Sequence, residues 1–297
     1  MSGVKDLARA KINLFLHVAA PDARGYHPLQ SLVVFADVGD VVEFLPKKAT
    51  ASAEDSKLTL RIDGRFAADL SAGEDNLILK AVRRFESLTG LAADRHDINL
   101  TKILPVASGL GGGSADAGAV LRQLRGFYCP DLEDSTLEAA ARMVGADGVM
   151  CLWNQSSIAE GYGENLTPLP LPSVPAVLIN PGVACPTSAV YDGFDALGAV
   201  TEIAAQQKFD AINDIDQLVA ALKTTRNDLQ KPAIQLQPVI AEVLKDLEAQ
   251  SETLLARMSG SGATCFALCA DGQAAKTLAG RLQGLWPAAW VCACRLG

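Results

Sequence analysis

The chain has 297 residues, 49% of them hydrophobic, so it can bury a sizeable core without disulfides or structural metals. Its 26 basic residues against 34 acidic ones give a net charge of −8, which disfavours nucleic acid or an anionic membrane as a partner. The length is typical of two domains, or of one large domain.

The cysteines and the N-terminal segment favour a reduced, intracellular protein. The seven cysteines are odd in number and show no CxxC spacing, and Cys151, Cys265 and Cys269 lie in apolar stretches typical of buried thiols. Residues 1–11 mix charges and lack the apolar core of a signal peptide. No apolar run reaches the length of a membrane span. We therefore expect a soluble, cytoplasmic protein.

The first hundred residues predict strands followed by a helix. Residues 10–18 and 31–45 are rich in β-branched and aromatic side chains and predict two strands around a turn. Residues 58–63 alternate between apolar and polar side chains, which predicts a half-buried strand. A helical apolar face then begins at residue 76 and ends before Gly90, and residues 98–104 predict another strand.

Two helices are predicted after the next glycine-rich run. The first begins near Ser114, and the second begins at Ser135, where Glu138 has the spacing of a capping box. Gly145 has the character of the residue that follows a helix. The apolar residues 149–153 then predict a strand.

A cluster of prolines marks the predicted domain boundary. Four prolines lie between residues 168 and 175. We place the N-terminal domain at residues 1–166 and the C-terminal domain at residues 167–297. Strands and helices occur in both halves, so the predicted class is mixed α+β.

The second half predicts two helices between strands. Residues 177–179 have the composition of a buried strand, and residues 231–249 carry an apolar helical face. A helix over residues 272–283 and a last strand over residues 289–295 complete the chain.

The glycine-rich run at residues 109–113 is the strongest functional signal. It lies between a predicted strand and a predicted helix, where converging backbone N–H groups and the helix dipole favour a phosphate. A Walker A loop would continue with Lys and Ser or Thr, but Gly113 is followed by Ser114 and Ala115. A dinucleotide fingerprint would need glycine at position 114. The run therefore predicts a phosphate loop of neither common kind, in preference to a merely flexible turn.

Three further features fit ordinary structure when each is taken alone. Lys11 lies in an apolar strand and could face solvent. Asp147 follows a predicted helix and could simply terminate it. The small residues 260–262 could form a hairpin turn.

Together these features resemble the GHMP kinase superfamily, which has three sequence motifs in this order. Within that family the similarity is greatest to members that phosphorylate a cytidine-diphosphate-linked methylerythritol in non-mevalonate isoprenoid biosynthesis. The triple glycine carries part of this similarity. The matching segments are residues 10–14, 105–115 and 258–264 for the three motifs, and residues 25–30, 145–147 and 181–183 elsewhere.

The resemblance implies a two-domain α+β GHMP kinase fold, with a ribosomal S5 domain 2-like N-terminal domain and a ferredoxin-like C-terminal domain. It implies ATP as the phosphoryl donor, with Mg²⁺ expected beside it, and the 2-hydroxyl of the cytidine-linked small molecule as the acceptor. Ser114 and Asp147 are candidate groups on the metal side. His17, His27 and His96 lack the spacing of a metal site, and the sequence does not indicate an oligomeric state.

The resemblance also implies roles for individual residues. Lys11 and Asp147 form the catalytic pair, Tyr26 and Tyr191 flank the cytosine ring, and His27 hydrogen-bonds to the base. The resemblance places Asn76 and Lys102 near the adenosine. It places Asn13, Thr187 and Asn227 or Asp228 along the erythritol and diphosphate. The residues that would hold the ATP phosphates are Pro105, Val106, Ala107, Ser108, Gly109, Leu110, Gly111, Gly112, Gly113, Ser114 and Ala115.

The chain departs from the family pattern directly after the proposed base. The family runs Gly-Ala-Asp-Val-Pro, whereas Asp147 is followed here by Gly148, Val149 and Met150. Because glycine frees the backbone and proline fixes it, we expect extra freedom beside Asp147 and an effect on turnover.

Three alternatives stay open. Another GHMP kinase, for homoserine or mevalonate, would give Tyr26, His27 and Tyr191 no base to bind. A non-catalytic nucleotide-binding protein of this fold is favoured only by the altered segment after Asp147. A dehydrogenase is disfavoured by Ser114.

Overall fold

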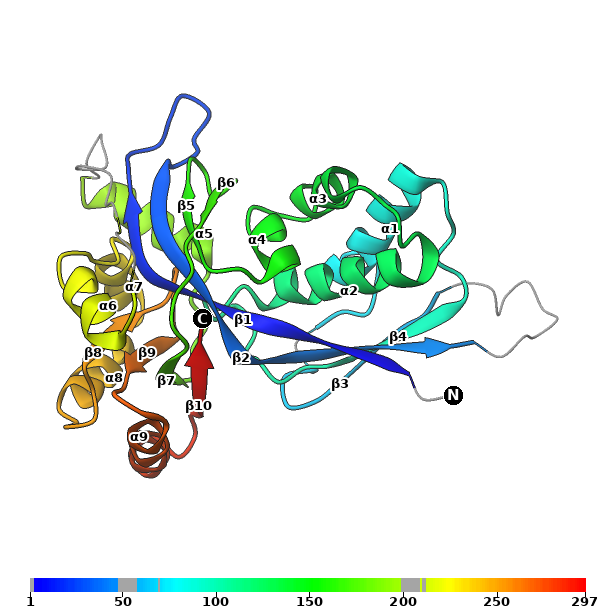
Figure 1. The fold of residues 1–297 in the computed structure, drawn as a ribbon. Coiled ribbons are helices and arrows are strands. Elements are labelled where there is room, and N and C mark those ends of the chain that lie inside the picture. Colours follow the sequence, from blue (N-terminus) through cyan, green and yellow to red (C-terminus); the bar gives the residue numbers. More distant parts are fainter. Residues whose placement is uncertain (1–2, 48–57, 69, 199–208, 210–211) are drawn as a thin grey trace. The chain divides into compact units, whose positions relative to one another are not determined.

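The computed structural model describes residues 3–47, 58–68, 70–198, 209 and 212–297 (Figure 1). Spatial proximity groups the chain into two compact units. The first unit contains Met1–Ala10, Gly39–Val106 and Gly111–Asn154, and the second contains Lys11–Val38, Ala107–Leu110 and Gln155–Gly297. The long strands β1 (Val4–Val18) and β2 (Leu29–Pro46) contribute residues to both units. The division into domains at residue 166 stays a prediction.

In the first unit, helices cover one face of a sheet (Figure 1). β2 pairs with β1 and, antiparallel, with β4 (His96–Thr101), and β4 pairs in parallel with β3 (Leu60–Asp63). Fully buried side chains such as Phe44, Phe85 and Ile98 form its core. The covering helices are α1 (Leu77–Thr89), α2 (Gly112–Tyr128), α3 (Asp134–Arg142) and α4 (Gly148–Trp153).

The predicted helix from Asn76 to Gly90 is confirmed as α1. The Asn76 side chain caps it by accepting a hydrogen bond from the Ile78 N–H at 2.9 Å. Gly90 ends it in the left-handed region, at φ 71°. Local capping chemistry thus fixes both ends of this helix.

The predicted capping box at Ser135 is wrong. α3 begins one residue earlier, with Asp134 in its first turn, and it ends at Arg142 rather than near Gly145. The Glu138 carboxylate accepts hydrogen bonds from the Trp153 indole and the Arg142 guanidinium instead of reaching back to the cap.

The predicted strand over residues 149–153 is also wrong, because this segment forms helix α4. Four of its five residues are buried, so its apolar run has no polar face from which a period could be read. Close backbone packing replaces the missing signal. A Cβ at Gly118 of α2 would lie 2.5 Å from the Cys151 carbonyl oxygen, so α2 and α4 meet at a glycine.

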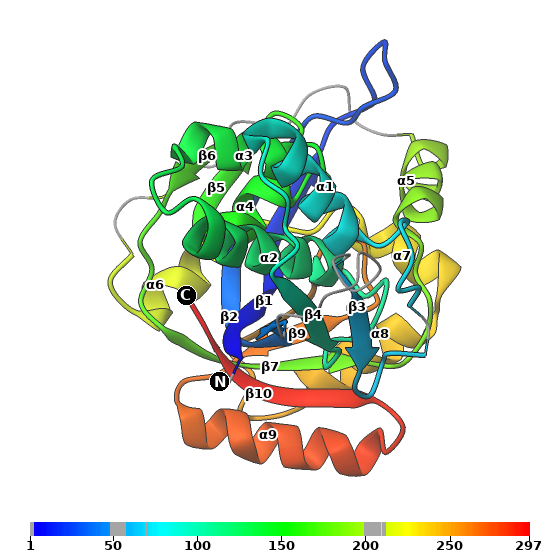
Figure 2. The same cartoon turned by 90° about the vertical axis from the view of Figure 1, so that its right-hand side faces the viewer.

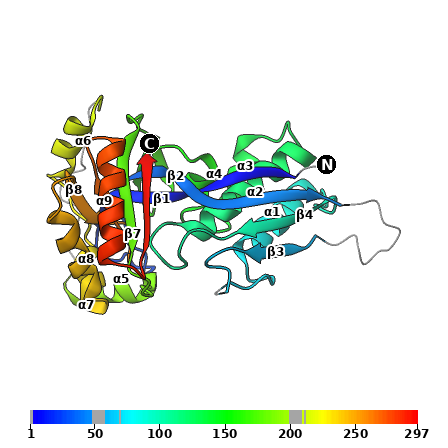
Figure 3. The ribbon, with the colours of Figure 1, turned by 90° about the horizontal axis from the view of Figure 1, so that it is seen from below.

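The second unit contains an antiparallel sheet in the order β10 (Trp290–Leu296), β7 (Val174–Asn180), β9 (Cys265–Leu268) and β8 (Leu255–Met258). β10 meets β2 at the pair Leu296–Ala36, and β2 also pairs with β5 (Ser157–Glu160) of the β5–β6 hairpin, in which β6 is Asn165–Pro168. Figure 2 shows α9 (Gly272–Leu285) running along β10, and Figure 3 shows it beside β7.

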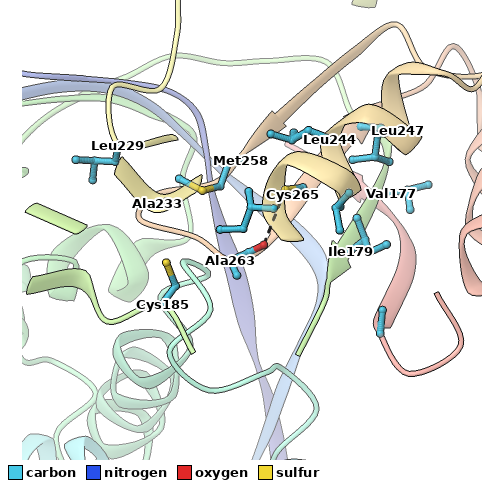
Figure 4. Close-up of a cluster of buried hydrophobic side chains, with 14 of the residues drawn as sticks. Val177, Ile179, Cys185, Leu229, Ala233, Leu244, Leu247, Met258, Ala263 and Cys265 are labelled. Carbon is cyan, nitrogen blue, oxygen red and sulfur yellow. Dashed lines mark hydrogen bonds between the residues drawn. The ribbon is translucent and has the colours of Figure 1, made fainter. Parts of the chain in front are cut away.

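A buried hydrophobic cluster packs the helices of the second unit against its sheet (Figure 4). Val177 and Ile179, two residues apart on β7, face the same side and pack with Leu244 and Leu247 of α8 (Val239–Glu248). The remaining helices of the described part are α5 (Thr187–Ala196), α6 (Ile215–Leu222) and α7 (Gln230–Leu236).

The single helix predicted over residues 231–249 is two helices, α7 and α8. Pro238 stands at the junction, in the N-cap position of α8. Proline disfavours helical geometry in the residue before it, and Gln237 accordingly leaves the helix at φ −135° and ψ 85°. The apolar period continues across the break, which is why the pattern predicted one element.

All seven cysteines are free thiols. None of the helices in the described ranges has both the length and the apolar character needed to cross a membrane.

Candidate active site

The backbone of the glycine-rich loop is shaped to bind an anion. Ala107, Gly109 and Gly111 have positive φ angles of 49°, 77° and 63°. Left-handed residues at alternate positions turn neighbouring N–H groups toward one side, which forms an anion-binding concavity. α2 begins directly afterwards at Gly112, so the free amides of its first turn add to the same field.

In the second unit, one serine joins the three motifs. The Ser259 hydroxyl accepts a hydrogen bond from the Asn13 N–H at 3.1 Å and donates one to the Gly109 carbonyl at 3.1 Å. The Lys11 N–H donates to the Leu110 carbonyl at 2.9 Å. The first motif, the start of the loop and the third motif are therefore adjacent, as their shared role in the family implies.

Gly109 is required where the loop meets the third motif. A Cβ on this residue would lie 2.4 Å from the Ser259 carbonyl oxygen, closer than side-chain atoms approach one another. Its φ of 77° is also unfavourable for other residues.

Lys11 does not face solvent, so the interpretation of this residue as an ordinary exposed strand position is wrong. Its side chain is buried, and its ammonium donates to the Asn13 Oδ1 at 2.9 Å. The Asn13 amide nitrogen in turn donates to the Ser31 hydroxyl at 2.7 Å. This chain of hydrogen bonds fixes the direction of a buried cation.

Three residues predicted to bind the acceptor, Thr187 along the erythritol and diphosphate and Tyr191 and His27 at the base, lie at or beside α5. Thr187, in its first turn, shares a hydrogen bond of 2.9 Å between its hydroxyl and that of Ser261 in the third motif. Tyr191, one turn later, has its ring centroid 4.8 Å from that of His27. The His27 Nδ1 lies 2.9 Å from the Ala19 carbonyl oxygen, and its Nε2 lies 3.6 Å from an Asp195 carboxylate oxygen.

Tyr26 precedes His27 on the loop between β1 and β2, and it is 62% exposed, which is unusual for a large aromatic side chain. Its ring meets the edge of the Tyr162 ring, with centroids 5.9 Å apart. The predicted contact of Tyr26 with a base stays a prediction.

Asn227 and Asp228 hold backbone segments of the site through hydrogen bonds. The buried Asn227 amide donates to the carbonyl oxygens of Met258 and Gly260, both at 2.8 Å, and so holds the turn of the third motif. Asp228 accepts a hydrogen bond from the Val18 N–H at 2.9 Å. Direct contact of either residue with substrate stays a prediction.

In the first unit, Asp147 occupies the N-cap position of α4. A Cβ at Gly148 would lie 2.0 Å from the Ala141 carbonyl oxygen, so α4 rests directly on α3 there. This glycine therefore permits close packing, and the expected extra backbone freedom beside Asp147 stays a prediction. A Cβ at Gly145 would lie 3.9 Å from the Ser114 hydroxyl, which puts this segment beside the first turn of α2.

Lys102 lies in a buried ion-pair cluster beneath the loop. Its ammonium donates to carboxylate oxygens of Asp40 and Asp116, and a Cβ at Gly112 would lie only 3.1 Å from it. Burial by itself would lower the pKa of Lys102, but the two carboxylates outweigh burial and raise it. Burial also raises the pKa of Asp116 to about 7. This cluster supports the start of α2, and a contact of Lys102 with adenosine stays a prediction.

The sequence did not single out Asp40 or Asp116. A signal existed, because Asp116 interrupts the apolar stripe of α2 at the spacing that Val120 continues. Asn76, by contrast, is predicted to lie near the adenosine, and its amide caps α1 and donates to the Ser71 carbonyl. A role of Asn76 at the nucleotide stays a prediction.

Comparison with known proteins agrees with the geometry. The family model of the GHMP kinases N terminal domain matches residues 76–155, and that of the GHMP kinases C terminal matches residues 204–288. A 4-diphosphocytidyl-2-C-methyl-D-erythritol kinase of Caulobacter vibrioides is 48% identical over 292 residues, which cover 97% of this chain and 98% of the relative.

Solved structures give the same result. The crystal structure of a 4-(cytidine 5'-diphospho)-2C-methyl-D-erythritol kinase matches with a TM-score of 0.75 at 31% identity, over 99% of each chain. A homoserine kinase from Cytophaga hutchinsonii, at 19% identity and a TM-score of 0.69 over 99% of this chain and 95% of its own, shows the shared fold alone. The predicted α+β GHMP kinase fold is confirmed, and the chain belongs to the GHMP kinase family.

Proposed function

We propose that this chain is an ATP-dependent kinase that phosphorylates the 2-hydroxyl of 4-diphosphocytidyl-2-C-methyl-D-erythritol in non-mevalonate isoprenoid biosynthesis. Similarity over nearly the whole chain to kinases of that name supports the proposal. We place the activity in the cytoplasm, in keeping with seven free thiols. The single observation that carries the proposal is the grouping of Tyr191 and His27, because an acceptor without a base would have no use for it.

The hydrogen bonding of His27 favours cytosine over uracil. The Ala19 carbonyl can only accept, so the His27 Nδ1 must carry the proton in that contact. In the neutral ring the Nε2 then offers a lone pair, and the Asp195 carboxylate beside it is a second acceptor. The exocyclic amino group of cytosine donates two hydrogens, whereas uracil presents a carbonyl oxygen at that position. Two acceptors suit the amino group.

The proposed chemistry needs a base and a cation. Asp147 accepts the proton of the acceptor hydroxyl as the bond to phosphorus forms. The Lys11 ammonium, oriented by Asn13, opposes the negative charge on the moving phosphoryl group. Phosphoryl transfer depends mainly on positioning and charge stabilisation, so a buried, fixed lysine is well suited to this role.

The glycine-rich loop and the start of α2 would hold the ATP phosphates. Mg²⁺ would accompany the nucleotide, and the Ser114 hydroxyl and the Asp147 carboxylate are oxygen groups of the kind that this ion prefers. When bound, the ion would neutralise charge on the phosphate oxygens.

A panel of acceptors tests the proposal. Purified protein is mixed with ATP, Mg²⁺ and one of four alcohols, and ADP release is followed by a coupled assay. The alcohols are the cytidylyl substrate, its uridylyl analogue, homoserine and mevalonate. We expect release with the first and much less with the second. Release with homoserine or mevalonate but not with the cytidylyl substrate would overturn the proposal.

A further inference from the structure

A carboxylate joins the loop that carries Tyr26 to a turn in another hairpin of the same unit. The Asp22 Oδ1 accepts hydrogen bonds from the backbone N–H groups of Arg24 at 2.8 Å and Tyr26 at 3.0 Å. The Asp22 Oδ2 accepts from the Tyr162 hydroxyl at 2.8 Å. Tyr162 lies in the turn between β5 and β6, so Asp22 links the two turns.

The Tyr162 side chain contacts this loop in three ways. Its hydroxyl donates to Asp22 and accepts from the Arg24 guanidinium at 2.7 Å. Its ring meets the exposed Tyr26 ring edge-on, with 67° between the ring planes. The Arg24 guanidinium carbon lies 5.1 Å from the Tyr162 ring centroid, within the range of a cation–π contact.

The same turn also holds the far end of the loop. The Leu29 N–H donates to the Gly161 carbonyl at 2.7 Å, and the Ala19 N–H donates to the Pro28 carbonyl at 2.9 Å. The hydrogen bond from the Tyr26 N–H, followed by that from the Tyr162 hydroxyl, keeps the pKa of Asp22 well below its usual range. Asp22 is therefore an ionised acceptor throughout the neutral pH range.

We infer that Tyr162 is a positioning residue for the acceptor's base: through Asp22 it holds the loop in the conformation that presents Tyr26 and His27. This inference rests on the proposed function. An exposed aromatic ring loses conformational freedom when a base stacks on it, and a loop that is ordered in advance reduces that cost. The effect must therefore appear in the affinity for the cytidylyl acceptor and not in that for ATP.

Tyr162→Phe tests the inference, because it removes the hydroxyl and keeps the ring. The hydroxyl takes part in two hydrogen bonds, with Asp22 and with Arg24, and loss of both at ordinary net strength predicts a rise of at least about 3-fold in the acceptor KM. The kcat and the KM for ATP should stay within about twofold of the wild-type values. Tyr128→Phe is the matched control, since the hydroxyl of this half-buried tyrosine likewise accepts a hydrogen bond from an arginine, here from the Arg95 backbone N–H at 2.9 Å, and its loss should leave both KM values unchanged.

A double-variant cycle separates positioning from general destabilisation. Asp22→Asn should raise the acceptor KM as well, and adding Tyr162→Phe to it should cost much less than in the wild type, because both changes weaken one interaction. The inhibition constant of cytidine 5′-diphosphate against the acceptor should rise in the same variants in which the acceptor KM rises.

Two failures can be told apart. If the wild-type protein does not turn over the cytidylyl acceptor, the proposed function is wrong and the inference falls with it. If the wild type is active but Tyr162→Phe leaves the acceptor KM unchanged, or raises the KM for ATP equally, only the inference is overturned.

Discussion

Gly148 follows the proposed catalytic base, and a substitution there tests whether close packing positions that base. In Gly148→Ala the new Cβ would lie 2.0 Å from the Ala141 carbonyl oxygen and 2.6 Å from its carbonyl carbon, whereas ordinary contact begins at 3.4 Å. The clashing atoms belong to the backbone of α3, so no side-chain rotation can relieve them. The two helices must separate locally by about 1.4 Å.

The expected cost follows from that separation. Overpacking in a core typically costs about 1–3 kcal/mol, and a backbone clash belongs at or above the upper end. We expect the free energy of unfolding to fall by about 3 kcal/mol, which lowers the Tm by about 6–12 °C for a chain of this size. Displacement of catalytic groups by about 1 Å can cost roughly 100-fold in rate, so kcat should fall by about that factor.

A second glycine in the same unit provides the control. Gly126 lies in α2, and a Cβ there would meet no atom within 4 Å. Gly126→Ala should therefore stabilise the helix by about 0.5–1 kcal/mol and leave kcat unchanged. Thermal unfolding and ADP release are measured for both variants. If Gly148→Ala keeps the Tm and kcat of the wild type, α4 is not held by this contact and the reasoning fails.

Three further predictions concern charge, stacking and pH. Asp147→Asn should lower kcat by at least about 100-fold while calorimetry still detects ATP binding, and near-normal turnover would refute the base assignment. Tyr26→Ala should raise the acceptor KM by about 10-fold, because stacking of a base contributes ~1–3 kcal/mol, and an unchanged KM would count against stacking. Because burial raises the pKa of Asp116 to about 7, the folded chain holds a proton that the unfolded chain releases near pH 4, so this group's contribution to stability falls as pH rises through that window. Asp116→Asn should reduce that fall in thermal scans from pH 4 to pH 8, and a pH profile identical to the wild type's would contradict the assignment.

Features encoded by neighbouring residues could be predicted from the sequence. The helix from Asn76 to Gly90 has a side-chain cap at one end and a left-handed glycine at the other, and both are local signals. The glycine-rich loop is similarly local, because backbone conformation and the start of a helix suffice to make an anion site. These features needed no knowledge of distant contacts.

Features decided by burial could not be predicted in this way. The sequence of α4 predicts a strand because nearly all of its residues are apolar and buried. The spacing of apolar residues distinguishes a helix from a strand only when one face of the element is polar. The break between α7 and α8 depends on Pro238, whose effect on Gln237 is local, but the apolar face on both sides hides it.

Ion-pair partners are also invisible in a single sequence. Lys102 could be placed on a strand end, but nothing in the sequence connects it with Asp40, 62 positions away. The same holds for the hydrogen on the His27 Nδ1, which depends on the position of the Ala19 carbonyl and not on the type of either residue.

The three family motifs are individually weak signals for a physical reason that the structure makes clear. A lysine in a strand, a glycine-rich turn and a small-residue hairpin each satisfy ordinary folding requirements alone. Ser259 makes them interdependent, because its hydroxyl accepts from Asn13 in the first motif and donates to Gly109 in the second. The contact requires a glycine at position 109, since any Cβ would strike the Ser259 carbonyl. Small residues in one motif therefore constrain residue choice in another, and their occurrence together is far more specific than any one of them.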